Sequence, residues 1–154
     1  GAILNVDLYD TTKYVFGGPS CSYFAIKNNK LIQLRTNRKF GFTKYVKMDD
    51  SYLNNCYVLK VGPGNYYNKE KKSIDHVTPE ILRYIKNEIY ADYRYQFKDQ
   101  RWMAIFQGMP SYYVKEGIKP NVSVDDSLTA IDKYNINWIN QKLKGTQEKS
   151  LASR

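Results

Sequence analysis

The sequence predicts an α+β protein in which an N-terminal antiparallel β region precedes a small three-helix module. Two observations favour this class. Short runs rich in β-branched and aromatic residues recur about every ten residues through the first sixty positions, with no helical period between them. From residue 77 onward, apolar residues instead recur at the spacing of amphipathic helices. We therefore expect a β region over residues 1–66, a helical module over residues 77–144 and a polar tail over residues 145–154.

The composition is typical of a chain that buries a core. Of its 154 residues, 42% are hydrophobic and 25% are charged, which argues against wholesale disorder. No run approaches the roughly 18 apolar residues of a membrane-spanning helix. No charged and then apolar leader opens the chain, so we expect a cytosolic protein, an already processed one or a piece of a longer one.

Five or six strands are expected in the first part. Runs typical of strands occupy residues 2–7, 13–16, 23–26, 31–34, 42–46 and 56–61. The segment Lys27–Lys30 contains two asparagines, which tolerate positive φ, and so predicts a hairpin turn. Gly62 begins a breaker that ends the β part, and the polar residues up to Asp75 are expected to form a linker.

The first two helices are predicted from capping residues and apolar spacing. Thr78 is a good N-cap and Pro79 suits the first helical position, so a helix is expected from there to about Tyr93. A shorter helix is expected over Asp99–Phe106, with Trp102 and Phe106 on its apolar side.

A third helix is expected after the capping cluster Asp125–Ser127. Its apolar face carries one polar residue, Asn135. A buried asparagine without hydrogen-bond partners costs about 1–3 kcal/mol, so we expect Asn135 to bind backbone groups. Our hypothesis is that it braces the loop Gln107–Tyr113.

The net charge is +9, with a pI near 9.4. The part up to His76 carries 12 basic and 6 acidic residues and the rest carries 12 and 9, so the excess is spread along the chain. A nucleic-acid binder usually concentrates its basic residues on one face, and we do not expect one here. A solvated basic surface is favoured. Attraction to a polyanion, such as nucleic acid, anionic lipid or a teichoic-type polymer, remains the alternative.

Counting residues excludes several kinds of site. One histidine, His76, and two cysteines, Cys21 and Cys56, cannot build a Cys/His zinc site or a typical His-based triad, so we expect no metal and no cofactor. In an oxidising compartment a bridge between Cys21 and Cys56 would stabilise the fold by roughly 4 kcal/mol. In a reducing cytosol both would be buried thiols.

One pair of acids resembles a catalytic pair by spacing alone. Glu88 and Asp92 stand four residues apart on the first helix, and paired carboxylates can perform acid and base catalysis. Arg83, Lys86 and Arg94 lie close enough in sequence to neutralise them, so surface ion pairing is the favoured interpretation. No serine or cysteine stands beside a recognisable base, and we expect no enzymatic activity.

Five motifs in register make residues 77–144 resemble the YARHG domain, which is named for a Tyr-Ala-Arg-His-Gly motif. They are Lys86-Asn87-Glu88-Ile89-Tyr90-Ala91; Phe97; Trp102 with Phe106; Pro110 with Tyr112-Tyr113; and the late helix from Leu128 through Ile131-Asp132 and Asn135-Ile136 to Ile139. The resemblance implies a structural framework of Asn87, Glu88, Phe97, Trp102, Phe106 and Asn135. Asp92-Tyr93-Arg94 replace the family's Arg-His-Gly, so a role of those three residues in the family does not carry over.

The resemblance also implies a cellular context. The family is similar to extracellular or envelope modules of unknown molecular function. It therefore implies a secreted or lipid-anchored protein, whose signal segment this sequence does not contain, and it favours the disulfide.

Fifteen tyrosines, often in pairs, provide candidate contact residues. Tyrosine joins an apolar ring to a hydroxyl and suits sugar or protein contacts as well as half-buried positions. The predicted binding residues are Tyr90, Tyr93, Arg94, Tyr112 and Tyr113. The leading hypothesis is a non-catalytic envelope or secreted binding module for glycan, peptidoglycan or a protein partner. The alternatives are a structural domain within a longer envelope protein and a nucleic-acid or polyanion binder.

Overall fold

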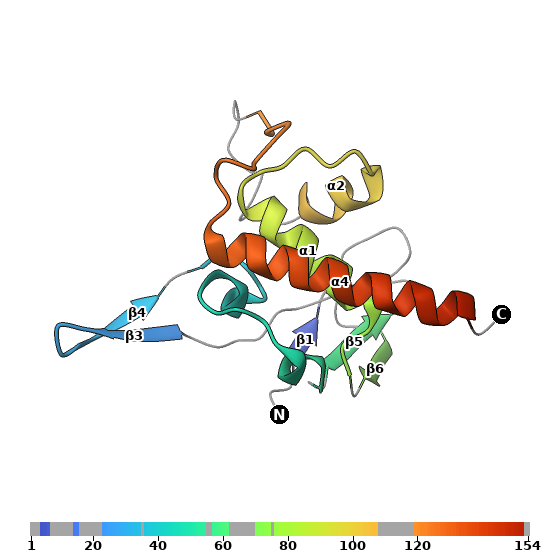
Figure 1. The fold of residues 1–154 in the computed structure, drawn as a ribbon, viewed down its shortest axis with the longest axis horizontal. Helices are drawn as coiled ribbons and strands as arrows, with labels where there is room; N and C mark the ends of the chain where they lie inside the picture. Colours follow the sequence, from blue (N-terminus) through green and yellow to red (C-terminus); the bar gives the residue numbers. More distant parts are fainter. Residues whose placement is uncertain are drawn as a thin grey trace.

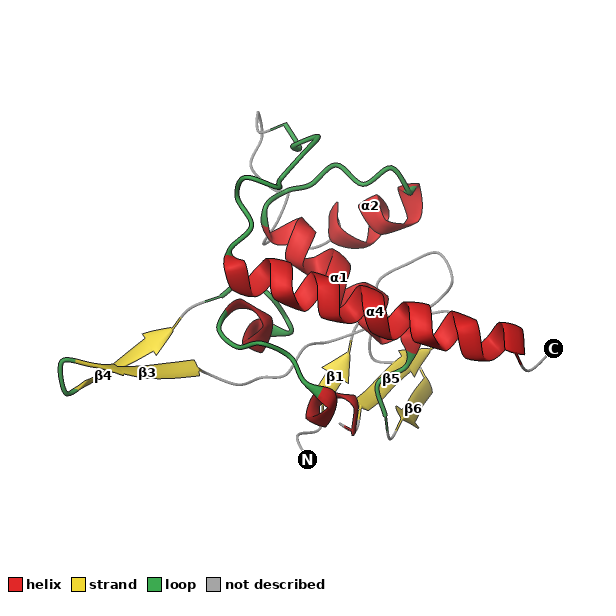
Figure 2. Ribbon diagram, viewed as in Figure 1, coloured by secondary structure: helices red, strands yellow, loops and turns green. Residues whose placement is uncertain are grey.

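The structure is a computed structural model that describes residues 4–6, 14–15, 23–34, 36–54, 57–61, 70–74, 76–107 and 119–152. It confirms the predicted α+β class: strands and short 3-10 turns come first, and three helices follow among the described residues (Figures 1 and 2). The two cysteines, Cys21 and Cys56, lie outside the described residues, as do Tyr112 and Tyr113.

The larger sheet is built around β5 (Tyr57–Val61). Along its whole length β5 pairs with antiparallel β6 (Glu70–Ile74). On the other side it pairs with β1 (Leu4–Val6), which is parallel, and with β2 (Tyr14–Val15), which is antiparallel. The β1–β5 pair thus departs from the expected antiparallel order. The linker predicted up to Asp75 is also wrong for residues 70–74, which form β6. These residues are mostly polar and show no apolar alternation, and their backbone pairing with β5 makes them a strand.

The predicted hairpin is confirmed. It consists of β3 (Tyr23–Lys27) and β4 (Lys30–Leu34), which pair in antiparallel register. The turn residues Asn28 and Asn29 have φ of 51° and 61°. Two consecutive left-handed residues match the right-handed twist of the strands, as in the favoured two-residue hairpin turns.

The strand predicted at Phe42–Val46 is wrong, because η1 (Gly41–Lys44), a 3-10 helix, occupies that segment. The Phe40 carbonyl accepts hydrogen bonds from both the backbone N–H and the hydroxyl of Thr43, which closes the turn. A second 3-10 helix, η2 (Asp50–Asn54), follows. Phe40, Thr43 and Met48 are buried, so this segment belongs to the interior of the protein.

The first two predicted helices are confirmed. In α1 (Pro79–Asp92) the Thr78 hydroxyl caps the first turn by accepting a hydrogen bond from the Ile81 N–H. The second helix is α2 (Gln100–Gln107), within one residue of its predicted ends. The helices are packed together, with α1 between α2 and α4 (Figure 1).

The third predicted helix, α4 (Ala130–Ala152), differs at both ends from the expectation. Thr129, rather than the cluster Asp125–Ser127, caps it: the Thr129 hydroxyl accepts from the Asp132 N–H, and the Asp132 carboxylate accepts from the Thr129 N–H. The helix also continues past Gly145 into the expected polar tail. One interior glycine costs only about 1 kcal/mol, which the helix-forming residues after it can offset.

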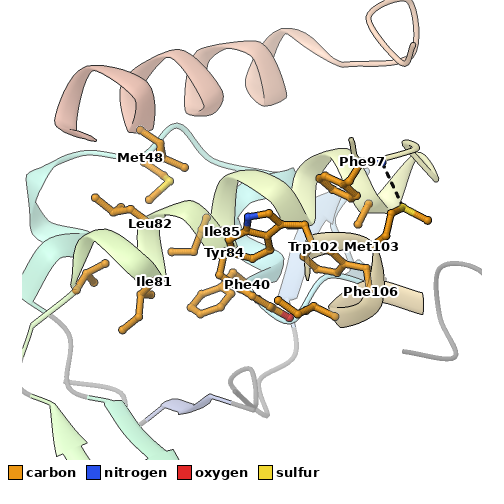
Figure 3. Close-up of a cluster of buried hydrophobic side chains, with 14 residues drawn as sticks. Phe40, Met48, Ile81, Leu82, Tyr84, Ile85, Phe97, Trp102, Met103 and Phe106 are labelled. Atoms are coloured by element: carbon orange, nitrogen blue, oxygen red, sulfur yellow. Dashed lines mark hydrogen bonds between the residues drawn. The ribbon is translucent and has the colours of Figure 1, made fainter. Parts of the chain in front are cut away.

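The core is a cluster of fourteen buried apolar residues (Figure 3). Ile81, Leu82, Tyr84 and Ile85 of α1 meet Trp102, Met103 and Phe106 of α2, and Phe40 and Met48 join them from the segment around η1. The backbone N–H of Phe97 donates to the Met103 sulfur at 3.2 Å. The core therefore links residues before the helices to the helices themselves.

Candidate functional site

A buried ionic network holds the segment before η1 against two helices. The Arg38 guanidinium lies 2.8 Å from Asp92 of α1 and 2.8 Å from Asp132 of α4, with the Arg38 and Asp132 side chains fully buried. The Tyr93 hydroxyl donates to the second carboxylate oxygen of Asp132. Each charge in this network is thereby paired, which a buried charge requires.

Arg38 and Asp132 are both charged at neutral pH. Burial lowers the pKa of Arg38, but the hydrogen bond and negative charge of Asp132, with those of Asp92, outweigh it and raise the pKa overall. Burial raises the pKa of Asp132, but the hydrogen bonds from Arg38 and Tyr93 outweigh it and lower the pKa overall. Burial and the bond to Asp132 raise the pKa of Tyr93 to about 12. The pKa shifts of Arg38, Asp132 and Tyr93 all move away from neutral pH and favour a stable ionic contact over proton exchange.

The predicted surface ion pairing of Glu88 and Asp92 is wrong. Glu88 is buried, and its carboxylate accepts hydrogen bonds from the Phe40 N–H at 2.8 Å and from the Tyr84 hydroxyl at 3.3 Å. Asp92 pairs with Arg38 instead of a neighbour on its own helix. Both acids lie on the side of α1 that faces the earlier segment, and sequence spacing along one helix cannot reveal that contact.

Asn135 braces backbone around η1, whereas residues 108–113 of the loop that we expected it to brace lie outside the described residues. Its side chain accepts a hydrogen bond from the Met48 N–H at 2.7 Å and donates to the carbonyls of Thr43 and Val46 at 3.0 and 2.9 Å. The side chain is completely buried. Asn135 thus holds the turn around η1 onto α4.

A pocket of about 320 Å³ opens at the exposed side of α1. Its lining residues are Lys86, Asn87, Tyr90, Tyr95, Phe97, Val122, Ser123, Val124 and Asp125, and we call it the Tyr90 pocket. The Tyr90 and Tyr95 rings lie 5.4 Å apart. Phe97 and Val124 are buried at its wall, while Val122 is 83% exposed.

Backbone pairing sets the second wall of the Tyr90 pocket. The Gln96 N–H donates to the Asn121 carbonyl and the Asn121 N–H donates to the Arg94 carbonyl, both at 2.8 Å. The Asn121 side chain donates to the Tyr93 carbonyl at 2.9 Å. These bonds place the segment after Asn121 beside the C-terminal end of α1.

The pocket offers hydrogen-bonding groups among apolar ones. Within the described residues, the Asn87 amide and the Tyr90 hydroxyl form no hydrogen bond. The Lys86 ammonium binds the Asn140 side chain at 3.2 Å, and burial, with the nearby Arg83 charge, lowers its pKa. Burial, with the Asp125 charge, raises the pKa of Tyr90, which keeps its hydroxyl protonated. This mixture suits an uncharged polar ligand with an apolar face.

The structure brings only part of the predicted binding set to this pocket. Tyr90 lines it, Tyr93 is bound within the Arg38 network, and Arg94 is exposed. Arg94 has φ of 57°, the left-handed position that follows the C-cap of α1. This is the position at which the YARHG motif has glycine, so a backbone role explains that glycine. Tyr95 and the segment Val122–Asp125 were missed, since no local pattern signals their pairing across the chain.

A larger pocket of about 550 Å³ lies at the other end of α1. It is lined by Leu53, Asn54, His76, Val77, Pro79, Leu82, Gln141, Lys142 and Gly145. Lys142 is paired with Asp50 at 2.6 Å. Across the described ranges, no group of three or more His, Cys, Asp or Glu side chains could hold a metal ion.

Comparison with protein families decides the assignment. The profile of the YARHG domain matches residues 55–142, more than half of the chain. The chain belongs to the YARHG domain family. No curated protein and no solved structure matches it.

The family match covers β5, β6, α1, α2 and the first part of α4, so it begins earlier than residue 77, where the resemblance was seen. YARHG is an extracellular or periplasmic type of domain, and its molecular function is unknown. Among the described residues, no helix has the length and apolar character to cross a membrane. Every residue lining the Tyr90 pocket lies within the YARHG match, whereas Arg38 and the η1 segment precede it.

Proposed function

We propose that this chain is a non-catalytic binding module that works outside the cell, secreted or anchored by a lipid, and that the Tyr90 pocket takes a glycan or peptidoglycan fragment. The observation that carries the proposal is the pairing of two tyrosine rings, in one open pocket, with an amide and a hydroxyl that form no hydrogen bond to the part of the chain that the structure describes. A sugar ring presents hydroxyl groups at its edge and an apolar C–H face, which these groups complement.

The polar chemistry of the pocket favours binding over catalysis. Neither Glu88 nor Asp92 lines it, because both are used in contacts with the segment before η1. Of the described residues that line it, Asp125 is the one acid. Acid and base catalysis of glycoside cleavage generally needs two carboxyl groups flanking one bond, so a glycosidase reaction is not the function that this lining supports.

A binding experiment with matched variants tests the proposal. Calorimetric titration with soluble peptidoglycan fragments and a glycan panel is expected to give binding that weakens about fivefold to tenfold in Tyr90→Phe and Asn87→Ala, since each loses one or two hydrogen bonds. Tyr134→Phe and Asn137→Ala are the controls, because these residues are exposed and lie outside the pocket.

Two results would contradict the proposal. One is a panel in which no fragment binds the folded protein. The other is binding that Tyr90→Phe and Asn87→Ala leave unchanged, which would put the ligand elsewhere. Tyr112→Ala and Tyr113→Ala test separately whether the other predicted tyrosines contribute.

A further inference from the structure

The β3–β4 hairpin is an isolated, projecting element. Figure 1 shows it extending away from the helices, and among the described strands β3 and β4 pair only with each other. A two-stranded hairpin is marginally stable alone in water and normally gains a third strand or a packed face. This hairpin is therefore expected to have a partner that covers it.

One face of the hairpin is apolar and open to water. Alternation and register place Phe24, Ile26 and Leu31 on the same face, because Ile26 lies directly opposite Leu31. Their exposed fractions are 53%, 77% and 70%. Three large apolar side chains exposed together on one projecting element mark an interaction surface rather than scattered surface residues.

The charge of this part of the chain specifies the partner. From Thr11 to Met48 the sequence contains eight basic residues and no acid, whereas the rest of the chain carries 16 basic and 15 acidic residues. By sequence, nearly all of the net charge of +9 thus lies in this one segment, which corrects the even spread expected from dividing the chain at His76. Arg38 is paired with Asp92 and Asp132, so the other seven basic residues carry the excess. At the hairpin tip, Lys27 pairs directly with Lys30 across the Asn28–Asn29 turn.

We propose that the β3–β4 hairpin is a membrane-surface anchor, which lays Phe24, Ile26 and Leu31 into the interfacial region of an anionic lipid bilayer while Lys30, on the opposite face, meets the lipid phosphates. Because the Lys27–Lys30 pair is one step along the ladder from the Ile26–Leu31 pair, Lys30 projects from the face opposite the apolar one. An apolar face backed by a basic face is the combination that lies in an anionic membrane surface, where burial of apolar area and electrostatic attraction add. A nucleic acid would neutralise the lysines but would leave the aliphatic side chains of Ile26 and Leu31 in water. The segment from Thr11 to Met48 contains basic residues and no acidic ones. A second copy of this chain is therefore disfavoured as the partner, because two positively charged segments would repel each other.

Vesicle flotation tests the proposal. The full chain is mixed with vesicles of phosphatidylcholine alone or with 30% phosphatidylglycerol, so about one lipid in three is anionic. The protein is expected to float with the anionic vesicles, to remain behind with the neutral ones, and to detach as salt is raised. A Phe24→Trp variant is expected to show a blue-shifted emission on the anionic vesicles, since its ring would leave water.

Matched variants separate the two parts of the anchor. Ile26→Ser with Leu31→Ser is expected to weaken partition about tenfold or more, through loss of apolar burial. Lys27→Gln with Lys30→Gln is expected to reduce partition most at low salt. Val122→Ser is the control, because Val122 is equally exposed but lies on the Tyr90 pocket. Circular dichroism verifies that each variant is folded.

Three outcomes would overturn the proposed membrane anchor. The protein could fail to float with anionic vesicles, or the double variant Ile26→Ser with Leu31→Ser could float as well as the original chain. A single-stranded oligonucleotide could also displace the protein from vesicles and bind the double variant as tightly as the original chain. Self-association through the hairpin, seen as a dimer that the same variant dissociates in the absence of vesicle binding, would also overturn it. The Tyr90 pocket plays no part in these measurements, so the proposed glycan binding stands or fails independently.

Discussion

At the scale of single residues, four polar side chains on the helices hold the segment that contains η1. Asp132 and Asp92 bind Arg38, Glu88 binds the backbone of Phe40, and Asn135 binds the backbone around Met48. Each is buried or largely buried, and each has partners for its polar atoms. Removing one member therefore leaves a buried group unpaired, which costs more than the net contribution of the bond.

The Asp132 carboxylate makes stability depend on pH. Its pKa is lower in the folded protein, so its stabilising effect is complete above its unfolded pKa of about 4 and is lost as the pH falls through the folded value. Asp132→Asn is expected to lower the free energy of unfolding by about 3 kcal/mol at pH 7. Urea unfolding should show this difference shrinking toward pH 3. A difference of equal size at both pH values would show that the charge of Asp132 is not what stabilises the fold.

Asn135 can be tested by truncation. Asn135→Ala removes the partner of three backbone groups, two of them in buried hydrogen bonds, and we expect the free energy of unfolding to fall by about 2–3 kcal/mol. Asn137→Ala, on an exposed turn of the same helix, should change it by less than about 0.5 kcal/mol. Thermal or urea unfolding followed by circular dichroism makes the comparison. Equal, small effects of the two substitutions would be incompatible with a bracing role.

At the scale of elements, the sequence predicts correctly those helices and turns whose local capping and turn residues agree with their tertiary contacts. The Thr78 cap with Pro79 marks the start of α1, and the asparagine pair marks the hairpin turn. The segment Phe42–Val46 fails for a physical reason: its β-forming residues are overruled by turn bonds and by Asn135, which is 89 and 92 positions away from the carbonyls it binds. In β6, by contrast, a segment without a local strand signal becomes a strand, because its backbone pairs with β5.

The end of α1 carries a strained residue that substitution can relieve. Arg94 is exposed and has φ of 57°, a conformation that costs a residue with a Cβ about 1 kcal/mol. Arg94→Gly is therefore expected to raise the free energy of unfolding by about 0.5–1 kcal/mol. Arg94→Ala, which keeps the Cβ, should give no such gain in the same unfolding experiment. A stabilising alanine together with a neutral glycine would refute this account of the turn.

At the scale of the whole molecule, the candidate site was predicted only in part. Tyr90 was expected from its place on α1, but the wall formed by Tyr95 and Val122–Asp125 depends on the bonds of Asn121, which carry no local signature. The Arg38 network joins positions 54 and 94 residues apart. Sequence periodicity identifies which face of a helix is buried, but not the distant segment that it is buried against.

The same contacts make the segment around η1 part of the unit that supports the Tyr90 pocket. Phe40 and Met48 lie in the core with α1 and α2, and their backbone N–H groups donate to Glu88 and Asn135. The division near residue 66 that we expected from the change in periodicity remains a prediction. The contacts favour a cooperative unit that includes residues 36–54 and the three helices.

Native-state hydrogen exchange tests this central claim most directly. We predict that the amides of Phe40 and Met48 exchange with the same opening free energy as the central amides of α1 and α4, because opening their hydrogen bonds requires unfolding the same core. If these two amides instead exchange with a much lower opening free energy while α1 and α4 stay protected, the segment around η1 is a separate, weakly held element, and the account is contradicted.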